Sequence, residues 1–221
     1  MQKDNFLKFV SFFFLIIGAS LLIFVFYPIV KYELDPSIGL RSFISPVPQD
    51  IQDLTKASNW FENNNKNDFN ENSKIVSYTI SIPSLKIKNA TVNVGGEDLS
   101  QSLIQYPGTA LPGKTGNTVI FGHSVLPQFF DPKNYLSIFS TLPDIKSDSK
   151  ITIDYDGVTY NFRVVDKFEV LPTDIDILNQ DEGSSVISLV TCVPPGDPRR
   201  PRRLIVRAKI DPTISYANTR S

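Results

Sequence analysis

The alternation of hydrophobic and polar residues divides the chain into three parts. Residues 9–30, FVSFFFLIIGASLLIFVFYPIV, contain no charged side chain and lie between Lys8 and Lys31. At about 1.5 Å per residue, a helix of this length crosses a hydrocarbon core of roughly 30 Å. Residues 31–74 are mostly polar and end in an Asn-rich run. From residue 75 onward, short apolar runs alternate with turn-forming residues, a pattern typical of a β-rich domain.

The apolar amino-terminal stretch predicts a transmembrane anchor. A cleaved signal peptide is the alternative, but the apolar core of such a peptide has only about 7 to 15 residues, and no clear small-residue cleavage site follows this stretch. The short tail at residues 1–8 carries Lys3 and Lys8, which favour a cytoplasmic amino terminus. We therefore expect a single-pass protein of the cell membrane, with the rest of the chain on the extracytoplasmic side.

The polar part, residues 31–74, is predicted to be a stalk or linker. Its Asn-rich end cannot bury enough apolar surface to fold by itself. The pattern allows one short amphipathic helix at residues 51–61, with Trp60 and Phe61 packing onto another part of the protein. The stalk would separate the anchor at residues 9–30 from a folded domain at residues 75–211. The last residues, 212–221, would form a carboxy-terminal tail.

The folded domain is predicted to be all-β. Runs rich in Val, Ile, Tyr and Phe give seven strands, at residues 75–82, 89–94, 117–123, 150–156, 158–170, 186–192 and 203–210. Asp156 and Gly157 suit a tight hairpin turn between two of these strands. Two short helices are expected, at residues 98–105, with Asp98 near the N-cap, and at residues 135–142. Seven or eight strands in a domain of this size predict a closed barrel or a sandwich.

Composition narrows the possible functions. The chain has 22 basic and 23 acidic residues, so its net charge gives no electrostatic reason to bind nucleic acid. The one basic cluster, Arg199 to Arg203, is short, lacks interleaved aromatic residues and by itself indicates a solvated loop. A single Cys cannot form an intramolecular disulfide, and one Cys with one His is too few ligands for a zinc site. We expect no metal and no other cofactor.

Three single residues are candidates for chemistry because each stands at a predicted strand end. His123 ends NTVIFGH, Cys192 ends SLVTC, and Arg203 opens RLIVRAKI. Taken separately, the histidine and the cysteine are more typical of packed residues than of catalytic ones. Together they form a chemical set, since a thiolate needs a neighbouring imidazole or cation to act as a nucleophile. An arginine can then stabilise the oxyanion that forms on the attacked acyl group.

In order and spacing, these three motifs resemble the signature of the sortase family. The preceding IPSLKIKNATVNV and YPGTALPGKTGNTV are also similar to the family, and the resemblance extends from residue 75 to about residue 210. It implies a closed eight-stranded β-barrel in which Cys192 is the nucleophile, His123 the acid and base, and Arg203 the group that orients substrate and stabilises the oxyanion. It further implies cleavage of an LPxTG-like sorting signal between Thr and Gly through a thioacyl intermediate.

Strand parity supports Arg203 over its neighbours and suggests residues that bind substrate. Leu204, Val206, Ala208 and Ile210 share one apolar face, so Arg203 and Ile205 share the other. A groove floored by Val190, Ile205 and Phe121, with Cys192, His123 and Arg203 at one end, is expected to receive a Leu-Pro pair of the substrate. Thr191 is also expected to bind substrate. Ser188 replaces the Thr that is usual in the family motif. The short Pro-rich loop at residues 193–202 resembles sortases of class C, D or E.

Two other functions remain open at this point. A membrane-tethered cysteine peptidase would use the same three residues but transfer the acyl group to water. A surface barrel that only binds peptides would keep Cys192 as a structural residue. The sortase interpretation implies two partners: surface proteins with a carboxy-terminal sorting signal, and an amine acceptor such as a peptidoglycan stem peptide or a pilin lysine.

Overall fold

The computed structural model describes residues 2–34, 39–40, 53, 55–60, 76–197 and 202–211. The chain forms two compact units, Met1–Asp35 and Pro36–Ser221. Most of the predicted stalk, the Asn-rich run and the predicted tail at residues 212–221 lie outside the described residues. Phe61, Arg199 and Arg200 lie outside them as well.

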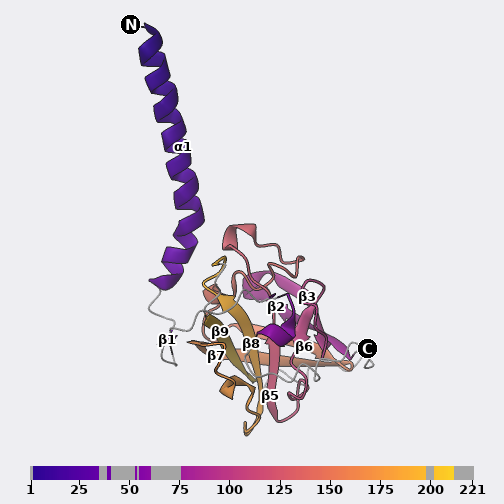
Figure 1. Ribbon diagram of the computed structural model, residues 1–221. Coiled ribbons are helices and arrows are strands. Elements are labelled where there is room, and N and C mark those ends of the chain that lie inside the picture. Colours follow the sequence, from indigo (N-terminus) through magenta and orange to yellow (C-terminus); the bar gives the residue numbers. More distant parts are fainter. Residues whose placement is uncertain are drawn as a thin grey trace. The chain divides into compact units, whose positions relative to one another are not determined.

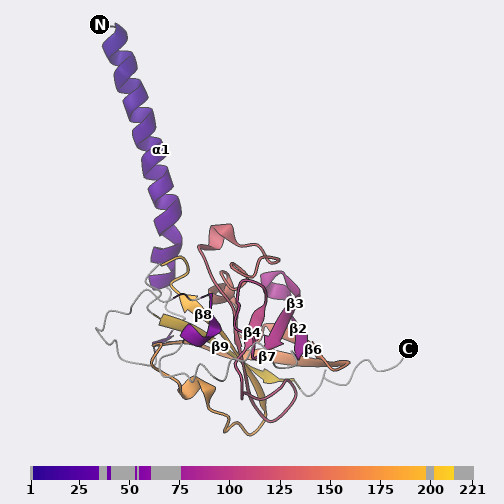
Figure 2. The same ribbon diagram turned by 45° about the vertical axis from the view of Figure 1, so that its right-hand side comes forward.

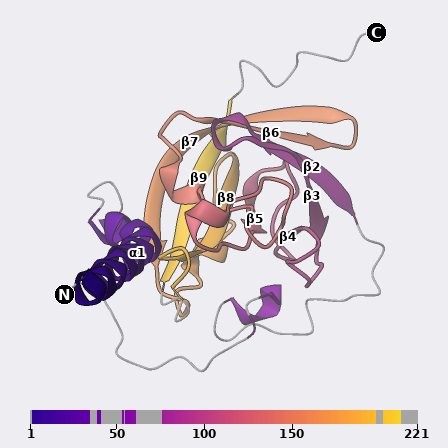
Figure 3. The same cartoon turned by 90° about the horizontal axis from the view of Figure 1, so that it is seen from above.

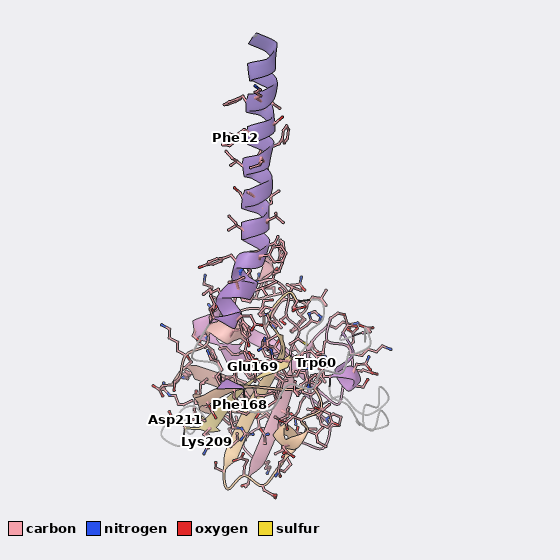
Figure 4. All side chains as sticks on the ribbon, turned by 60° about the vertical axis from the view of Figure 1, so that its left-hand side comes forward. Phe12, Trp60, Phe168, Glu169, Lys209 and Asp211 are labelled. Atoms are coloured by element: carbon pink, nitrogen blue, oxygen red, sulfur yellow. The ribbon has the colours of Figure 1, made fainter. Side chains whose placement is uncertain are left out.

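The first unit is one long helix, α1, Gln2–Glu33 (Figure 1). Its stretch Lys8–Glu33 is long and apolar enough to cross a membrane, as the sequence predicts. Large apolar side chains are exposed around the helix, Phe12 among them (Figure 4). A helix that is apolar on all sides is typical of one surrounded by lipid rather than of one that packs a single face on a protein core.

The second unit is a closed β-barrel. Its strands are β2 Ser77–Ile82, β3 Ile87–Val94, β4 Leu103–Gln105, β5 Gly116–Phe121, β6 Lys150–Tyr155, β7 Val158–Val170, β8 Ser185–Val193 and β9 Arg202–Ile210. They pair in the order β7-β6-β2-β3-β4-β5-β8-β9, and β9 pairs back with β7 to close the ring (Figure 3). A two-residue strand, β1 Gly39–Leu40, adds in parallel to the end of β7. The predicted eight-stranded barrel is confirmed.

In the described residues of this unit, the helical segments are short 3₁₀ turns. They are η1 Ala57–Asn59, η3 Pro83–Leu85, η4 Pro127–Phe129, η5 Leu142–Asp144 and η6 Asp176–Leu178. The hairpin between β6 and β7 turns at Asp156 and Gly157, whose φ angles are 52° and 74°. Both residues therefore have the positive φ that the predicted tight turn requires.

The two helices predicted in the barrel domain, at residues 98–105 and 135–142, are not formed, so both predictions are wrong. At residues 98–102 the chain turns, because the Asp98 carboxylate accepts hydrogen bonds from the backbone and hydroxyl of Ser100. Leu103–Gln105 then form β4, which pairs in parallel with β3. Residues 135–141 form turns that lead into the 3₁₀ helix Leu142–Asp144. Side-chain oxygens of Asp and Asn compete with helical hydrogen bonds in just such segments.

Strand β8 is buried along its whole length, on both faces. Leu189, Leu204 and Val206 face away from the cluster that contains Cys192, since alternate residues of a strand point to opposite sides. The face of β8 and β9 that holds Cys192, Val190 and Ile205 is covered by residues 55–60, a part of the predicted stalk (Figure 2). We refer to residues 55–60 as the cover segment.

Candidate active site

Cys192 and Arg203 are direct neighbours on adjacent antiparallel strands. They are Cα partners in the β8–β9 ladder, so their backbones lie about 4.5–5.5 Å apart. Both side chains are almost fully buried, with 3% of Cys192 and 2% of Arg203 exposed. The parity argument that selects Arg203 from the basic cluster is consistent with this register.

His123 lies on the other side of Cys192. Strands β5 and β8 are parallel, with Phe121 opposite Val190. The chain continues along β8 after β5 ends: the Gly122 N–H donates to the Val190 carbonyl at 3.1 Å, and Ser124 Oγ donates to the Cys192 carbonyl at 2.8 Å. His123, two residues after Phe121, therefore lies beside Cys192, two residues after Val190. Histidine, cysteine and arginine form a row across the ends of three adjacent strands.

The glycine before the histidine is required by packing. A Cβ built on Gly122 would lie 2.3 Å from a ring atom of Phe139 and 2.7 Å from a methyl carbon of Leu103. The backbone of residue 122 can approach β8 and the Phe139 ring only without a side chain. In the GH pair of the motif, Gly122 is therefore needed for packing and His123 is the candidate for chemistry.

A second row lies next to the first and holds three of the four predicted substrate-binding residues. Phe121, Val190 and Ile205 are paired across β5, β8 and β9, and all three are fully buried in the cluster with Cys192. Thr191 is on the opposite face of β8, where its Oγ1 donates to the Gly122 carbonyl at 2.9 Å. Its hydroxyl ties the histidine segment to β8.

The cover segment packs on these two rows. Trp60 is fully buried and stacks on Phe121, with ring centroids 5.2 Å apart and planes 14° from parallel. Tyr106 packs edge-on against Phe121, with ring centroids 5.8 Å apart. Figure 4 labels Trp60 together with Phe168, another member of the same cluster. The predicted packing of Trp60 is confirmed, although the local structure is a 3₁₀ turn.

The cover segment also holds Arg203. The arginine Nε donates to the Trp60 carbonyl at 3.0 Å, and its Cζ lies 5.6 Å from the centroid of the indole ring. The backbone of the segment is bonded to residues 97–99: Ala57 N–H donates to the Glu97 carbonyl, and Leu99 N–H donates to the Thr55 carbonyl. In this arrangement the Arg203 guanidinium donates to two backbone carbonyls, those of Trp60 and Arg202.

Arg202 has a structural role that the sequence does not reveal. It belongs to β9 and its guanidinium lies 2.8 Å from a carboxylate oxygen of Glu169, a residue of β7 that is 3% exposed. The interpretation of Arg202 as solvated loop charge is therefore wrong. A buried carboxylate needs such a partner, because desolvation of an unpaired charge is costly.

Two groups that contact the His123 segment are not predicted from the sequence motif. Ser124 clips the histidine segment to Cys192, as described above, and its only sequence cue is its position after the histidine. The second is a backbone group: the Leu136 carbonyl oxygen lies 2.8 Å from His123 Nδ1. No residue type predicts a contact made by a backbone carbonyl.

The order of the motifs, their register and the fold match a known protein family. The family model described as "Sortase domain" matches residues 80–211. The chain belongs to the sortase family. Sortase A of Streptococcus agalactiae serotype III (strain NEM316) is 24% identical over 139 residues, which cover 62% of this chain and 54% of that relative. The chain thus spans about half the length of the curated sortase that it matches.

Solved sortases share the barrel. A lid mutant of sortase A from Corynebacterium diphtheriae is 32% identical, with a TM-score of 0.52 over 63% of this chain and 73% of that one. Sortase C-1 from Actinomyces oris is 26% identical, with a TM-score of 0.53 over 61% of this chain and 73% of that one. The likeness therefore covers the barrel unit of this sortase.

Proposed function

We propose that this sortase is a membrane-anchored cysteine transpeptidase that cleaves an LPxTG-like sorting signal and transfers the acyl group to an amine. The observation that carries the proposal is the row His123, Cys192, Arg203, with the nucleophile in the centre. A thiol between an imidazole and a guanidinium has both groups that acyl transfer needs: a proton carrier and an oxyanion donor.

The reaction would proceed in two acyl transfers. Cys192 Sγ attacks the carbonyl carbon of the Thr–Gly bond, and Arg203 donates hydrogen bonds to the oxyanion. His123 protonates the leaving Gly nitrogen, which leaves a thioester on Cys192. An incoming amine then attacks the thioester, His123 takes the proton of the amine, and the Cys192 sulfur leaves. The row Phe121, Val190, Ile205 would receive the apolar part of the signal, and Thr191, on the opposite face of β8, would support the site through its hydrogen bond to the Gly122 carbonyl.

The anchor helix gives the proposal its location. We place the amino terminus in the cytoplasm and the barrel outside the cell membrane, since the apolar stretch of α1 follows Lys3 and Lys8 and precedes the whole barrel. The substrates would be surface proteins with a carboxy-terminal sorting signal. The acceptor would be an amine of the cell envelope, a peptidoglycan stem peptide or a pilin lysine. This sortase needs no metal for either step.

The experiment uses the full chain in detergent and a panel of fluorogenic LPxTG-like peptides, with and without an amine acceptor. We expect cleavage that depends on Cys192 and His123, and a ligated product, identified by mass, when the amine is present. Cleavage to the free acid alone, at any amine concentration, would show a peptidase instead. Absence of cleavage, together with Cys192 alkylation that does not change in His123→Ala, would show a peptide-binding barrel.

The role of Arg203 is tested with a matched pair of variants. Arg203→Lys keeps the charge but loses the planar guanidinium, and we expect kcat to fall by roughly 10²-fold, the range for removal of an oxyanion donor. Arg207→Lys makes the same change four residues further along β9, where the guanidinium lies 3.2 Å from Glu182, and should leave kcat nearly unchanged. Equal effects of the two changes would contradict the proposed role.

A further inference from the structure

The hydrogen bond between His123 and a backbone carbonyl determines which ring nitrogen carries the proton. A carbonyl oxygen only accepts hydrogen bonds, so Nδ1, at 2.8 Å from the Leu136 oxygen, must be the protonated nitrogen. In the neutral ring Nε2 is then the unprotonated, basic nitrogen. Nε2 is therefore the atom that can exchange a proton with the Cys192 thiol or with an amine at the thioester.

The Leu136 carbonyl is held in place by a short polar turn. The Leu136 N–H donates to Asn134 Oδ1 at 3.0 Å, and the Ser137 N–H donates to the Asn134 backbone carbonyl at 3.0 Å. The peptide groups on both sides of the Leu136 Cα are therefore bonded to Asn134. The next step of the turn is fixed by Ser137 Oγ, which accepts from the Asp131 N–H and donates to the Asp131 carbonyl.

The residues that follow this turn also form hydrogen bonds with the backbone of the His123 segment. The Phe139 N–H donates to the His123 carbonyl at 3.0 Å, and Ser140 Oγ accepts from the Val125 N–H at 2.9 Å. A further hydrogen bond, from the Thr91 N–H of β3 to Tyr135 Oη, fastens the turn to the barrel. Ring, backbone and supporting turn thus form one hydrogen-bonded unit.

We infer that Asn134 is a positioning residue of this sortase, which holds the Leu136 carbonyl where it fixes the His123 ring in the Nδ1–H tautomer. This inference rests on the proposed function for its catalytic consequence, but the tautomer itself is independent of any substrate. Asn134 is exposed and touches neither the thiol nor the guanidinium in any described contact. Its effect on the reaction passes through the histidine ring.

The experiment exploits the single histidine of the chain. With ¹⁵N-histidine labelling and no histidine tag, the imidazole spectrum of the full chain in detergent reports His123 alone. At a pH where the ring is neutral, we expect a protonated Nδ1 and an unprotonated Nε2 in the unaltered chain. In Asn134→Ala both tautomers should be populated. The kcat for peptide transfer should fall by roughly three- to tenfold, the range of one hydrogen bond, with little change in KM.

Two further variants separate positioning from a general effect on the fold. Asn134→Asp keeps an acceptor oxygen for the Leu136 N–H and should restore the Nδ1–H tautomer. Asn179→Ala removes the same kind of turn, in which Asn179 Oδ1 accepts from the Asp181 N–H, in the connection between β7 and β8. It should leave the imidazole spectrum and kcat unchanged.

Each outcome has a defined meaning. An unaltered imidazole spectrum in Asn134→Ala overturns the inference, as does a tautomer change with no change in kcat. A tautomer change with a fall in kcat, reversed in Asn134→Asp, supports it. If the unaltered chain transfers no peptide at all, the proposed function fails, while the tautomer populations still decide whether Asn134 positions the ring.

Discussion

Replacement of Trp60 by Ala tests whether the cover segment controls access to Cys192. The thiol is 3% exposed, and the fully buried Trp60 belongs to the same cluster. We therefore expect movement of residues 55–60 to open a route for a reagent or substrate to the sulfur. The segment lies outside the part of the chain that the sortase family model matches, residues 80–211.

The size of the effect follows from the burial of the indole. Replacement of a fully buried Trp by Ala typically costs about 3–5 kcal/mol. Much of this loss falls on the docked state of the segment, because the indole packs on Phe121 and Arg203 from outside the strands. Each 1.4 kcal/mol changes an equilibrium constant tenfold, so the equilibrium constant for docking would decrease by about 10²-fold or more and the undocked fraction would rise. We expect Cys192 alkylation to become at least tenfold faster.

The assay is alkylation of the single cysteine by iodoacetamide, followed by intact mass. Trp60→Phe, which keeps an aromatic ring on Phe121, is the matched control and should give a smaller increase. Thermal unfolding is measured on the same samples. An unchanged alkylation rate with a strongly lowered Tm would refute the reasoning, since Trp60 would then be a core residue of the barrel and Cys192 would be reached by another route.

Two further predictions concern the barrel around the site. Burial, with a smaller contribution from Tyr155, raises the pKa of Tyr78 well above its usual value of 10.0. The stability that the neutral hydroxyl provides is therefore present below pH 10 and is lost as the pH rises through the raised pKa. Tyr78→Phe leaves Gln105 Oε1 without its donor and should lower the free energy of unfolding in urea by about 1–3 kcal/mol at pH 7. The loss should be smaller in alkaline buffer. An equal loss at both pH values would contradict the raised pKa of Tyr78. Gly122→Ala should lower Tm and slow peptide cleavage at least tenfold, because its Cβ would overlap the Phe139 ring and displace His123, and a variant with wild-type kcat would refute this.

The sequence predicts the strands of the barrel well where their pattern is long. Strands β6 to β9 have runs of β-branched and aromatic residues, and their positions differ from the prediction by one or two residues at most. Strand β4 is missed because three residues cannot display a period of two. Its formation depends on parallel pairing with β3, a contact between distant parts of the chain that no local pattern records.

The candidate site is predictable in its residue types but not in its surroundings. Strand parity places Cys192 and Arg203 on the same face of β8 and β9, but the register that makes them Cα partners is set by the fold. The partner of Arg203 is a backbone carbonyl, that of Trp60, and the partner of the His123 ring is the Leu136 carbonyl. Every residue has a carbonyl, so only the fold decides which one is used.

The spacing of the three motifs along the chain is a consequence of the barrel topology. Strands β5 and β8 are parallel, so the chain must return to the same edge of the sheet before it can place Cys192 beside His123. It does so through the long excursion that contains the β6–β7 hairpin, and this accounts for the separation between residues 123 and 192. Strands β8 and β9 are antiparallel, so a short loop suffices to bring Arg203 back to Cys192. The long interval from His123 to Cys192 therefore reflects a parallel pairing, and the short interval from Cys192 to Arg203 reflects an antiparallel one.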